Sequence, residues 1–373
     1  KNPLVKVFGM KFCTIICEYD PFHKMHAGHM KFAREASGCD FLVCLMSGNF
    51  VQRGRPAVTD RFTRAKHALL AGADVVIELP LLSAAAAADD FAFGAARILD
   101  FIGAEALSFG CESGNAEFLR SCAEFQLSEE YDRRVRRFLS EGISYPKACG
   151  KALRGKLPEP LENPNDILAA GYLRECGKLG FRPEIYPMKR NEGYNDTAFS
   201  ERASSSAIRL ARSRGEDYSA AVPSFVFADD DKWTNIEDYE KLVFLSRNLW
   251  NAEYLAKIRG ISEGIENRIL SARASSYGEF FSLLKTKRYT EGRLRRALLD
   301  CLLGVTSEIA EEYKKSKPYS RLLGFRKESE GALKRLAPLF SEAPRSVAAL
   351  ERKADGLYEA LAGRIIRNYP VKI

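Results

Sequence analysis

FCTIICEYDPFHKMHAGHMKFAREA, residues 12–36, carries an apolar run, a histidine-rich turn and a helical pattern in that order. The run 12–17 predicts a buried strand, and the pattern over 30–36 predicts a helix. His23, His26 and His29, three of the chain's four histidines, fall between them. In an α/β domain such a turn lies at the carboxyl end of the first strand, where ligands bind. The free N–H groups of the following helix favour an anion such as a phosphate.

The rest of the first half alternates strand and helix patterns. Apolar runs predict strands at 41–46, 74–80 and 105–110, and helical patterns separate them at 61–71 and 84–99. Strands separated by helices of this length are typical of βαβ units. The sequence therefore predicts an α/β fold with a parallel sheet.

The second half is mostly helical by its pattern. The later segments predict helices within 116–157, at 165–173 (capped by Asn165 or Asp166) and from Ser204, with an edge strand at 183–188. Pro223 and the acidic run 229–231 indicate a domain boundary near 222–235. Beyond it we expect a mostly helical segment to the end of the chain.

The composition limits the class of protein. The chain has 373 residues, enough for two domains with proper cores, and its net charge of +8 is compatible with an acidic partner such as a nucleic acid. Its nine cysteines include no C-x-x-C pair, which favours free thiols in a reducing cytoplasm. With no run of about 20 apolar residues, we expect no membrane span and no secretory signal.

The histidine cluster allows three interpretations. Its H-x-x-H-x-x-H spacing supplies the imidazoles of a zinc site, and solvated turn histidines are the simplest alternative. We favour a nucleotide site, in which His23, His26 and His29 bind phosphate oxygens and stabilise the charge on departing pyrophosphate.

Three further motifs carry glycines, hydroxyls or positive charge. The segment 47–56, SGNFVQRGRP, follows the second strand, and its arginines suit phosphate or carboxylate; otherwise it is a polar surface loop. The segment 204–209, SSSAIR, is typical of a helix start that binds a phosphate. Otherwise it is an ordinary serine cap with a surface arginine. The segment 285–296, KTKRYTEGRLRR, suits a nucleic-acid backbone or a solvated helix face.

Together these stretches resemble one family, the bacterial tRNA(Met) cytidine acetate ligases, within the nucleotidyltransferases that carry an H-x-G-H signature. The resemblance covers nearly the whole chain from Met10. The matching segments are 17–23, 47–56, 73–80, 107–112, 164–168, 204–209, 263–268, 287–290 and 323–325. Their number and order carry the resemblance.

The resemblance implies a Rossmann-like, nucleotidyltransferase-type catalytic domain over 10–222 and a mostly helical tRNA-binding domain over 235–373. It implies that ATP and acetate form acetyl-adenylate and pyrophosphate. The acetyl group then passes to N4 of the wobble cytidine of elongator tRNA(Met). We expect Mg²⁺ on the ATP phosphates and no metal ligands from the protein itself; the oligomeric state stays open.

The resemblance also implies the residues of each site, with His23, His26 and His29 as the catalytic group. The expected ATP site comprises Ile16, Cys17, Glu18, Tyr19, Asp20, Pro21, Phe22, His23, Lys24, Met25, His26, Ala27, Gly28, His29, Gly110, Asn165, Arg190, Asn191, Ser205, Ser206 and Arg209. The expected tRNA contacts are Lys285, Lys287, Arg288, Arg293, Arg295 and Arg296.

The family signature fits the turn in two registers. Without a gap, His23, His26 and His29 align with the family's histidines and Met25 replaces a glycine. Alternatively, His26-Ala27-Gly28-His29 is the H-x-G-H itself, after a three-residue insertion. Other functional hypotheses are a small-molecule adenylyltransferase of the same class and a catalytically impaired tRNA-binding relative.

Overall fold

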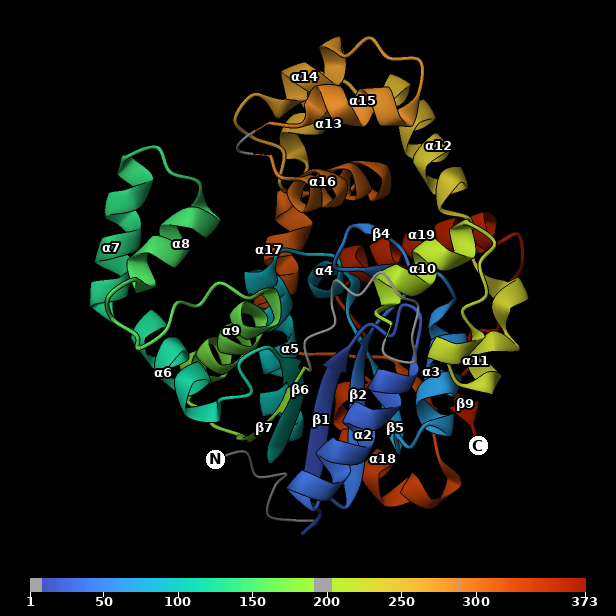
Figure 1. Ribbon diagram of the computed structural model, residues 1–373. Coiled ribbons are helices and arrows are strands. Elements are labelled where there is room, and N and C mark those ends of the chain that lie inside the picture. Colours follow the sequence, from blue (N-terminus) through green and yellow to red (C-terminus); the bar gives the residue numbers. More distant parts are fainter. Residues whose placement is uncertain (1–8, 191–202, 287–288) are drawn as a thin grey trace.

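A seven-stranded sheet forms the centre of the computed structural model, which describes residues 9–190, 203–286 and 289–373 (Figure 1). The strand order is β7-β6-β1-β2-β5-β8-β9. The strands are β1 (Phe12–Cys17), β2 (Phe41–Ser47), β5 (Val75–Leu79), β6 (Ala106–Cys111), β7 (Glu184–Lys189), β8 (Leu322–Phe325) and β9 (Val371–Lys372). The first five strands in space, β7 to β5, run parallel, as the sequence predicted.

Helices cover both faces of the sheet. Alternate residues of β2 point to opposite faces: Cys44 packs in one core with α2 (Lys24–Ser37) and α3 (Arg61–Leu70). Leu45 packs in the other core with α5 (Ala88–Ile102) and α9 (Pro164–Lys178). The buried runs of the sequence are therefore strands covered on two sides, which is the usual reason for continuous apolar strands.

The remaining elements lie around this centre (Figure 1). The helices are α4 (Leu81–Ala84), α6 (Ala116–Gln126), α7 (Glu129–Ser140), α8 (Tyr145–Leu153), α10 (Ser205–Ser213), α11 (Ser224–Phe227), α12 (Ile236–Ser246), α13 (Ala252–Lys257), α14 (Ile265–Ser271), α15 (Tyr277–Leu284), α16 (Glu291–Leu303), α17 (Ser307–Lys315), α18 (Glu330–Leu336) and α19 (Arg345–Ala362). A small separate ladder pairs β3 (Phe50–Val51) with β4 (Arg55–Pro56). Within the described ranges, no helix combines the length and apolar character needed to cross a bilayer.

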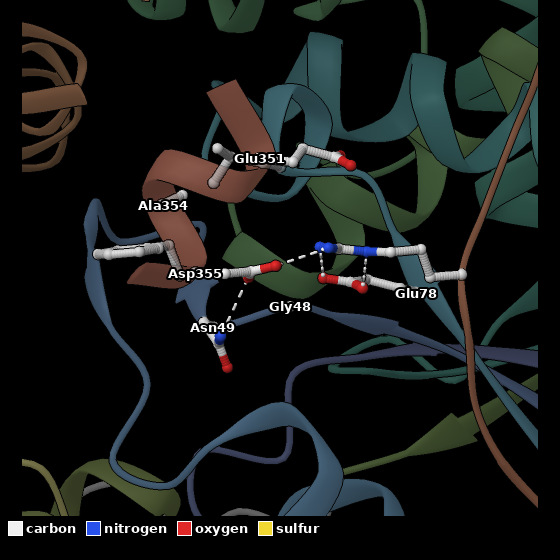
Figure 2. A pocket seen from close by; sticks show the side chains of 9 residues that line it. Gly48, Asn49, Glu78, Glu351, Ala354 and Asp355 are labelled. Carbon is white, nitrogen blue, oxygen red and sulfur yellow. Dashed lines mark hydrogen bonds and ion pairs between the residues drawn. The ribbon is translucent and has the colours of Figure 1, made fainter. Parts of the chain in front are cut away.

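The end of the chain returns to the sheet, where the sequence predicted a mostly helical segment and indicated no strand. Strand β8 pairs antiparallel with β5 and so covers the edge of that strand. Its residue Leu323 is fully buried. An ion-pair cluster fixes this return. Arg321 donates to Glu78 and Asp355, each at 2.7 Å, and Asn49 donates to Asp355 at 3.2 Å (Figure 2). The residues drawn in Figure 2 line a small cavity, far too small to admit a nucleotide.

A glycine lies where the loop between β3 and β4 contacts the helical part of the chain. Gly54 has φ +72°, and a Cβ there would lie 2.5 Å from the backbone nitrogen of Arg296 on α16. The hydroxyl of Tyr239 also donates to the carbonyl of Gly54 at 3.1 Å. The loop between β3 and β4 therefore contacts α16 backbone to backbone, which only glycine permits.

We predict that Gly54→Ala destabilises the protein more than Gly215→Ala. Gly215 has nearly the same φ, +71°, but no atom lies within 4 Å of the point where its Cβ would be. Both substitutions force alanine into the left-handed region, whereas Gly54→Ala adds a clash of about 1–3 kcal/mol. Chemical denaturation measures the two free energies of unfolding, and equal losses would contradict the proposed close contact.

Candidate active site

Helix α2 begins inside the histidine cluster, earlier than the helix expected at residue 30. His23 is its N-cap, with extended backbone angles, and His26 is its third residue. The backbone N–H of His23 donates to His26 Nδ1 at 3.3 Å, and the two rings stack with centroids 3.5 Å apart. Nδ1 of His23 is buried and has no hydrogen-bond partner among the described residues. An acceptor or donor from a ligand would satisfy this atom.

His29 is fixed against the neighbouring strand. Its Nε2 lies 2.9 Å from Ser108 Oγ, and that hydroxyl donates to the carbonyl of Tyr186 at 2.8 Å. Because the Ser108 proton is used there, the network assigns the donor role to His29 Nε2. The three histidines therefore do not converge, and among the residues with described positions no three His, Cys, Asp or Glu side chains gather around a common metal position.

The cluster is neutral near pH 7. Burial, together with the positive charge of Arg190, lowers the pKa of His23 to about 3 and that of His29 to about 4. Burial and the adjacent His23 and His29 hold the pKa of His26 well below its usual value. Neutral imidazoles donate hydrogen bonds to an anion without having to bind a proton first.

The carboxylate of Asp20 joins three segments just before this helix. It accepts a hydrogen bond from Val58 N at 2.7 Å and pairs with Arg55, while Arg209 lies 3.4 Å away and also donates to the Asp20 carbonyl. Asp20 is only 4% exposed. Burial would raise its pKa, but Arg55 and Arg209 outweigh that effect and hold the pKa below its ordinary value.

Helix α10 brings its hydroxyls to the same turn. Ser204 caps the helix by accepting from Ala207 N at 3.3 Å. Ser205 Oγ donates to the Pro21 carbonyl at 3.2 Å, and Ser206 Oγ accepts from Arg209 at 2.8 Å. The segment 204–209 thus meets the histidine turn, about 180 residues earlier in the chain, as the nucleotide interpretation requires.

A buried arginine that the sequence did not single out connects the ends of β1 and β2. Arg64 is fully buried and donates to the carbonyls of Glu18 at 2.7 Å, Ser47 at 2.9 Å and Thr59 at 3.0 Å, as well as to that of Gly48. A charged residue within the helical pattern 61–71 gives no sign that it is buried. The signal would have been its place one turn into this helical pattern, which follows the expected strand-end loop 47–56 closely in the sequence.

Gly110 and Asn165 lie at the carboxyl end of β6. The side chain of Arg190 passes 3.6 Å from where a Cβ of Gly110 would be. Asn165 donates to Glu112 through its side-chain amide at 2.6 Å and through its backbone N–H at 3.1 Å.

The predicted cap of α9 was wrong. Asn163 is the N-cap of this helix because Pro164, which lacks an N–H, takes the first helical position. Asn191 lies outside the described residues.

The remaining predicted ATP-site residues divide into a packed set and an outer set. Cys17, Tyr19, Pro21 and Phe22 are buried, with Ile16 and Glu18 half-buried. Glu18 accepts from Gln52 N at 2.7 Å, and burial raises its pKa. Lys24, Met25 and Ala27 are half-buried on α2, and Gly28 is exposed with open space around it.

A family model and several curated proteins match this chain over most of its length. Residues 10–362 match the family model "HIGH Nucleotidyl Transferase". The tRNA(Met) cytidine acetate ligase of Clostridium perfringens is 36% identical over 88% of this chain and 87% of its own. That of Ligilactobacillus salivarius is 32% identical over 97% of both chains.

The chain belongs to the tRNA(Met) cytidine acetate ligase family. A solved structure, Thermotoga maritima TmcAL bound with alpha-thio ATP, is similar over 98% of this chain and 100% of that chain, with a TM-score of 0.84 and 30% identity. The nucleotidyltransferase-type fold expected from the resemblance is thereby confirmed.

The basic segment of this family member begins before α16 and continues along it. Lys285 pairs with Glu291 at 3.2 Å, Arg293 with Glu263 at 3.3 Å and Arg295 with Glu240 at 3.3 Å. Arg296 donates to the Gln52 carbonyl at 3.3 Å, next to the loop that contacts Glu18. The segment therefore adjoins the candidate active site. Lys287 and Arg288 lie outside the described residues.

We predict that His29 makes the stability of the protein pH-dependent. Its folded pKa of about 4 lies below the ordinary value of 6.5, so on acidification the unfolded chain takes up a proton first. Its contribution to stability is complete above pH 6.5 and is lost toward pH 4. In His29→Gln, the fall in unfolding free energy over this range should be shallower by up to about 1.4 kcal/mol per pH unit. Identical slopes for both proteins in denaturation experiments would contradict this assignment.

Proposed function

We propose that this chain activates acetate with ATP and transfers the acetyl group to N4 of the wobble cytidine of elongator tRNA(Met). The observation that carries the proposal is the start of α2, where the neutral imidazoles of His23, His26 and His29 lie near Arg190 and Arg209. The rings of His23 and His29 are buried, and that of His26 is half-buried. Helix N–H groups, imidazoles and guanidinium groups together suit a triphosphate. The similarity to a relative bound with alpha-thio ATP supports the same assignment.

The first step is an adenylyl transfer. A carboxylate oxygen of acetate attacks the α-phosphorus of ATP, the bond to the β-phosphate oxygen breaks, and acetyl-adenylate and pyrophosphate form. The chain supplies positioning and charge stabilisation rather than a covalent group. In the proposal His23 and His26 bind the phosphates. His29 holds α2 against β6 through its hydrogen bond to Ser108.

The carboxylates near the turn do not suit a dedicated protein site for Mg²⁺. Asp20 is held by arginines, and Glu112 accepts from the start of α9. Mg²⁺ would therefore be held by the phosphates and water, where it neutralises the charge that develops on pyrophosphate.

The second step brings in the tRNA. The N4 amine of cytidine attacks the acetyl carbon, AMP leaves, and the amine loses a proton. We propose that the mostly helical segment from 235 onward positions the tRNA through the six predicted basic residues, because Arg296 adjoins the Gln52 loop. The nine free cysteines agree with a cytoplasmic setting, where this chemistry would take place.

The most direct test of the proposed function is mass spectrometry of elongator tRNA(Met) after incubation with protein, ATP and acetate. We expect one acetylated cytidine, at the wobble position, and none when ATP or acetate is omitted. Acetylation elsewhere, or unmodified tRNA after complete reactions, would contradict the proposal.

We predict that His26→Ala slows acetate-dependent ATP–pyrophosphate exchange by about 10²–10³-fold, the usual loss for one preorganised donor. Lys31→Ala is the matched control, because its side chain is 77% exposed on the same helix. Exchange at the wild-type rate in His26→Ala would rule out the role given to this imidazole.

We predict that Lys287→Ala combined with Arg288→Ala weakens tRNA binding. The slope of the logarithm of the binding constant against the logarithm of the salt concentration should become shallower by roughly one unit for each phosphate that the variant no longer neutralises. Acetate-dependent exchange without tRNA should be unchanged. Loss of exchange with unchanged tRNA affinity would instead place these residues in the active site.

A further inference from the structure

The connection from β6 to β7 is longer than a parallel crossover requires. Helices α6 and α9 pack with each other beside the sheet, and one such helix would complete the crossover. Between them, α7 and α8 pack mainly against each other and form a helical hairpin that projects from the molecule (Figure 1). We call residues 129–156 the arm.

The arm is strongly basic. It contains eight basic and four acidic residues, a net charge of +4 in a chain whose total is +8. Its inner side is apolar, because Tyr131 and Val135 of α7 and Ala148 of α8 belong to the main core. The charges are therefore concentrated on its solvent-exposed side.

Three arginines, Arg133, Arg136 and Arg137, lie on the exposed face of α7. Arg133 approaches Glu129 only to 4.0 Å, and Arg137 lies 3.5 Å from Glu141. The Nε of Arg136 donates to the Asp132 carbonyl at 3.4 Å. Exposed pairs of this kind contribute about 0–1 kcal/mol, so a phosphate can replace the present partners at little cost. Arginine is also the side chain best suited to bidentate phosphate contacts.

The position of the arm relates it to the candidate active site. Its chain leads directly to the start of α9, where Asn165 donates to Glu112 just beyond the carboxyl end of β6. In Figure 1 the arm and helices α13 to α16 both lie toward the side to which the arrow of β1 points. A polyanion that enters the site from this side would meet both.

We propose that the arm is a second tRNA-binding surface, which holds backbone phosphates of the tRNA at a distance from the acetylated base. The inference rests on the proposed function and adds a contact region separate from the basic segment of α16. The exposed face of α7 presents these three arginines beside Glu129, Asp132 and Ser140, with Leu139 as its one apolar residue. A face on which charged and polar groups predominate suits phosphate contacts rather than insertion into an apolar partner.

The test compares two triple variants that each remove three exposed positive charges. Arg133→Ala, Arg136→Ala and Arg137→Ala change the arm. Lys327→Ala, Lys334→Ala and Lys372→Ala change the region of α18 and β9, on another side of the molecule (Figure 1). Affinity for an elongator tRNA(Met) transcript is measured over a range of salt concentrations, and acetate-dependent ATP–pyrophosphate exchange is measured without tRNA.

We expect the arm variant to bind tRNA at least about tenfold more weakly, with a salt slope lower by roughly two to three units. Exchange should stay at the wild-type rate in both variants, and the control should bind tRNA normally. Equal affinity of wild type and arm variant, or equal weakening in the control, would overturn the arm proposal alone. A wild-type protein that neither binds nor acetylates tRNA would overturn the proposed function as well.

Discussion

The structure depends above all on one buried carboxylate. Asp20 accepts hydrogen bonds from β4 and the residues just after it, through Arg55 and Val58 N, and it pairs with Arg209 of α10. An unpaired carboxylate at this depth would cost several kcal/mol, so these segments must stay together for the fold to form. Asp20 lies three residues before His23, the N-cap of α2, so the same interaction anchors the segment that leads into this helix.

Charge balance then explains why the site suits an anion. Asp20 offsets Arg55 and Arg209, while burial and positive neighbours keep the three histidines uncharged. Arg64 is satisfied by backbone carbonyls alone among its described hydrogen bonds. What remains at the start of α2 is a set of donors, because the nearby Asp20 carboxylate is already engaged by Arg55, Arg209 and Val58 N, and this arrangement is complementary to phosphates.

Much of this arrangement could be predicted from sequence, and the exceptions have physical causes. The apolar runs of β1, β2, β5 and β6 indicated the sheet because buried parallel strands are continuously hydrophobic. Strand β8 was missed because its four residues are too few to show a period, and Arg321 fixes it only through partners distant in sequence. Arg64 was missed for a similar reason, since most of its partners lie at or just after the ends of β1 and β2.

The measurement that tests this account most directly is a crystal structure with a non-hydrolysable ATP analogue. The account predicts that the triphosphate lies at the start of α2, with phosphate oxygens within about 3 Å of His23 or His26 and the first free N–H groups of the helix. A nucleotide bound elsewhere, with the start of α2 unchanged, would contradict it.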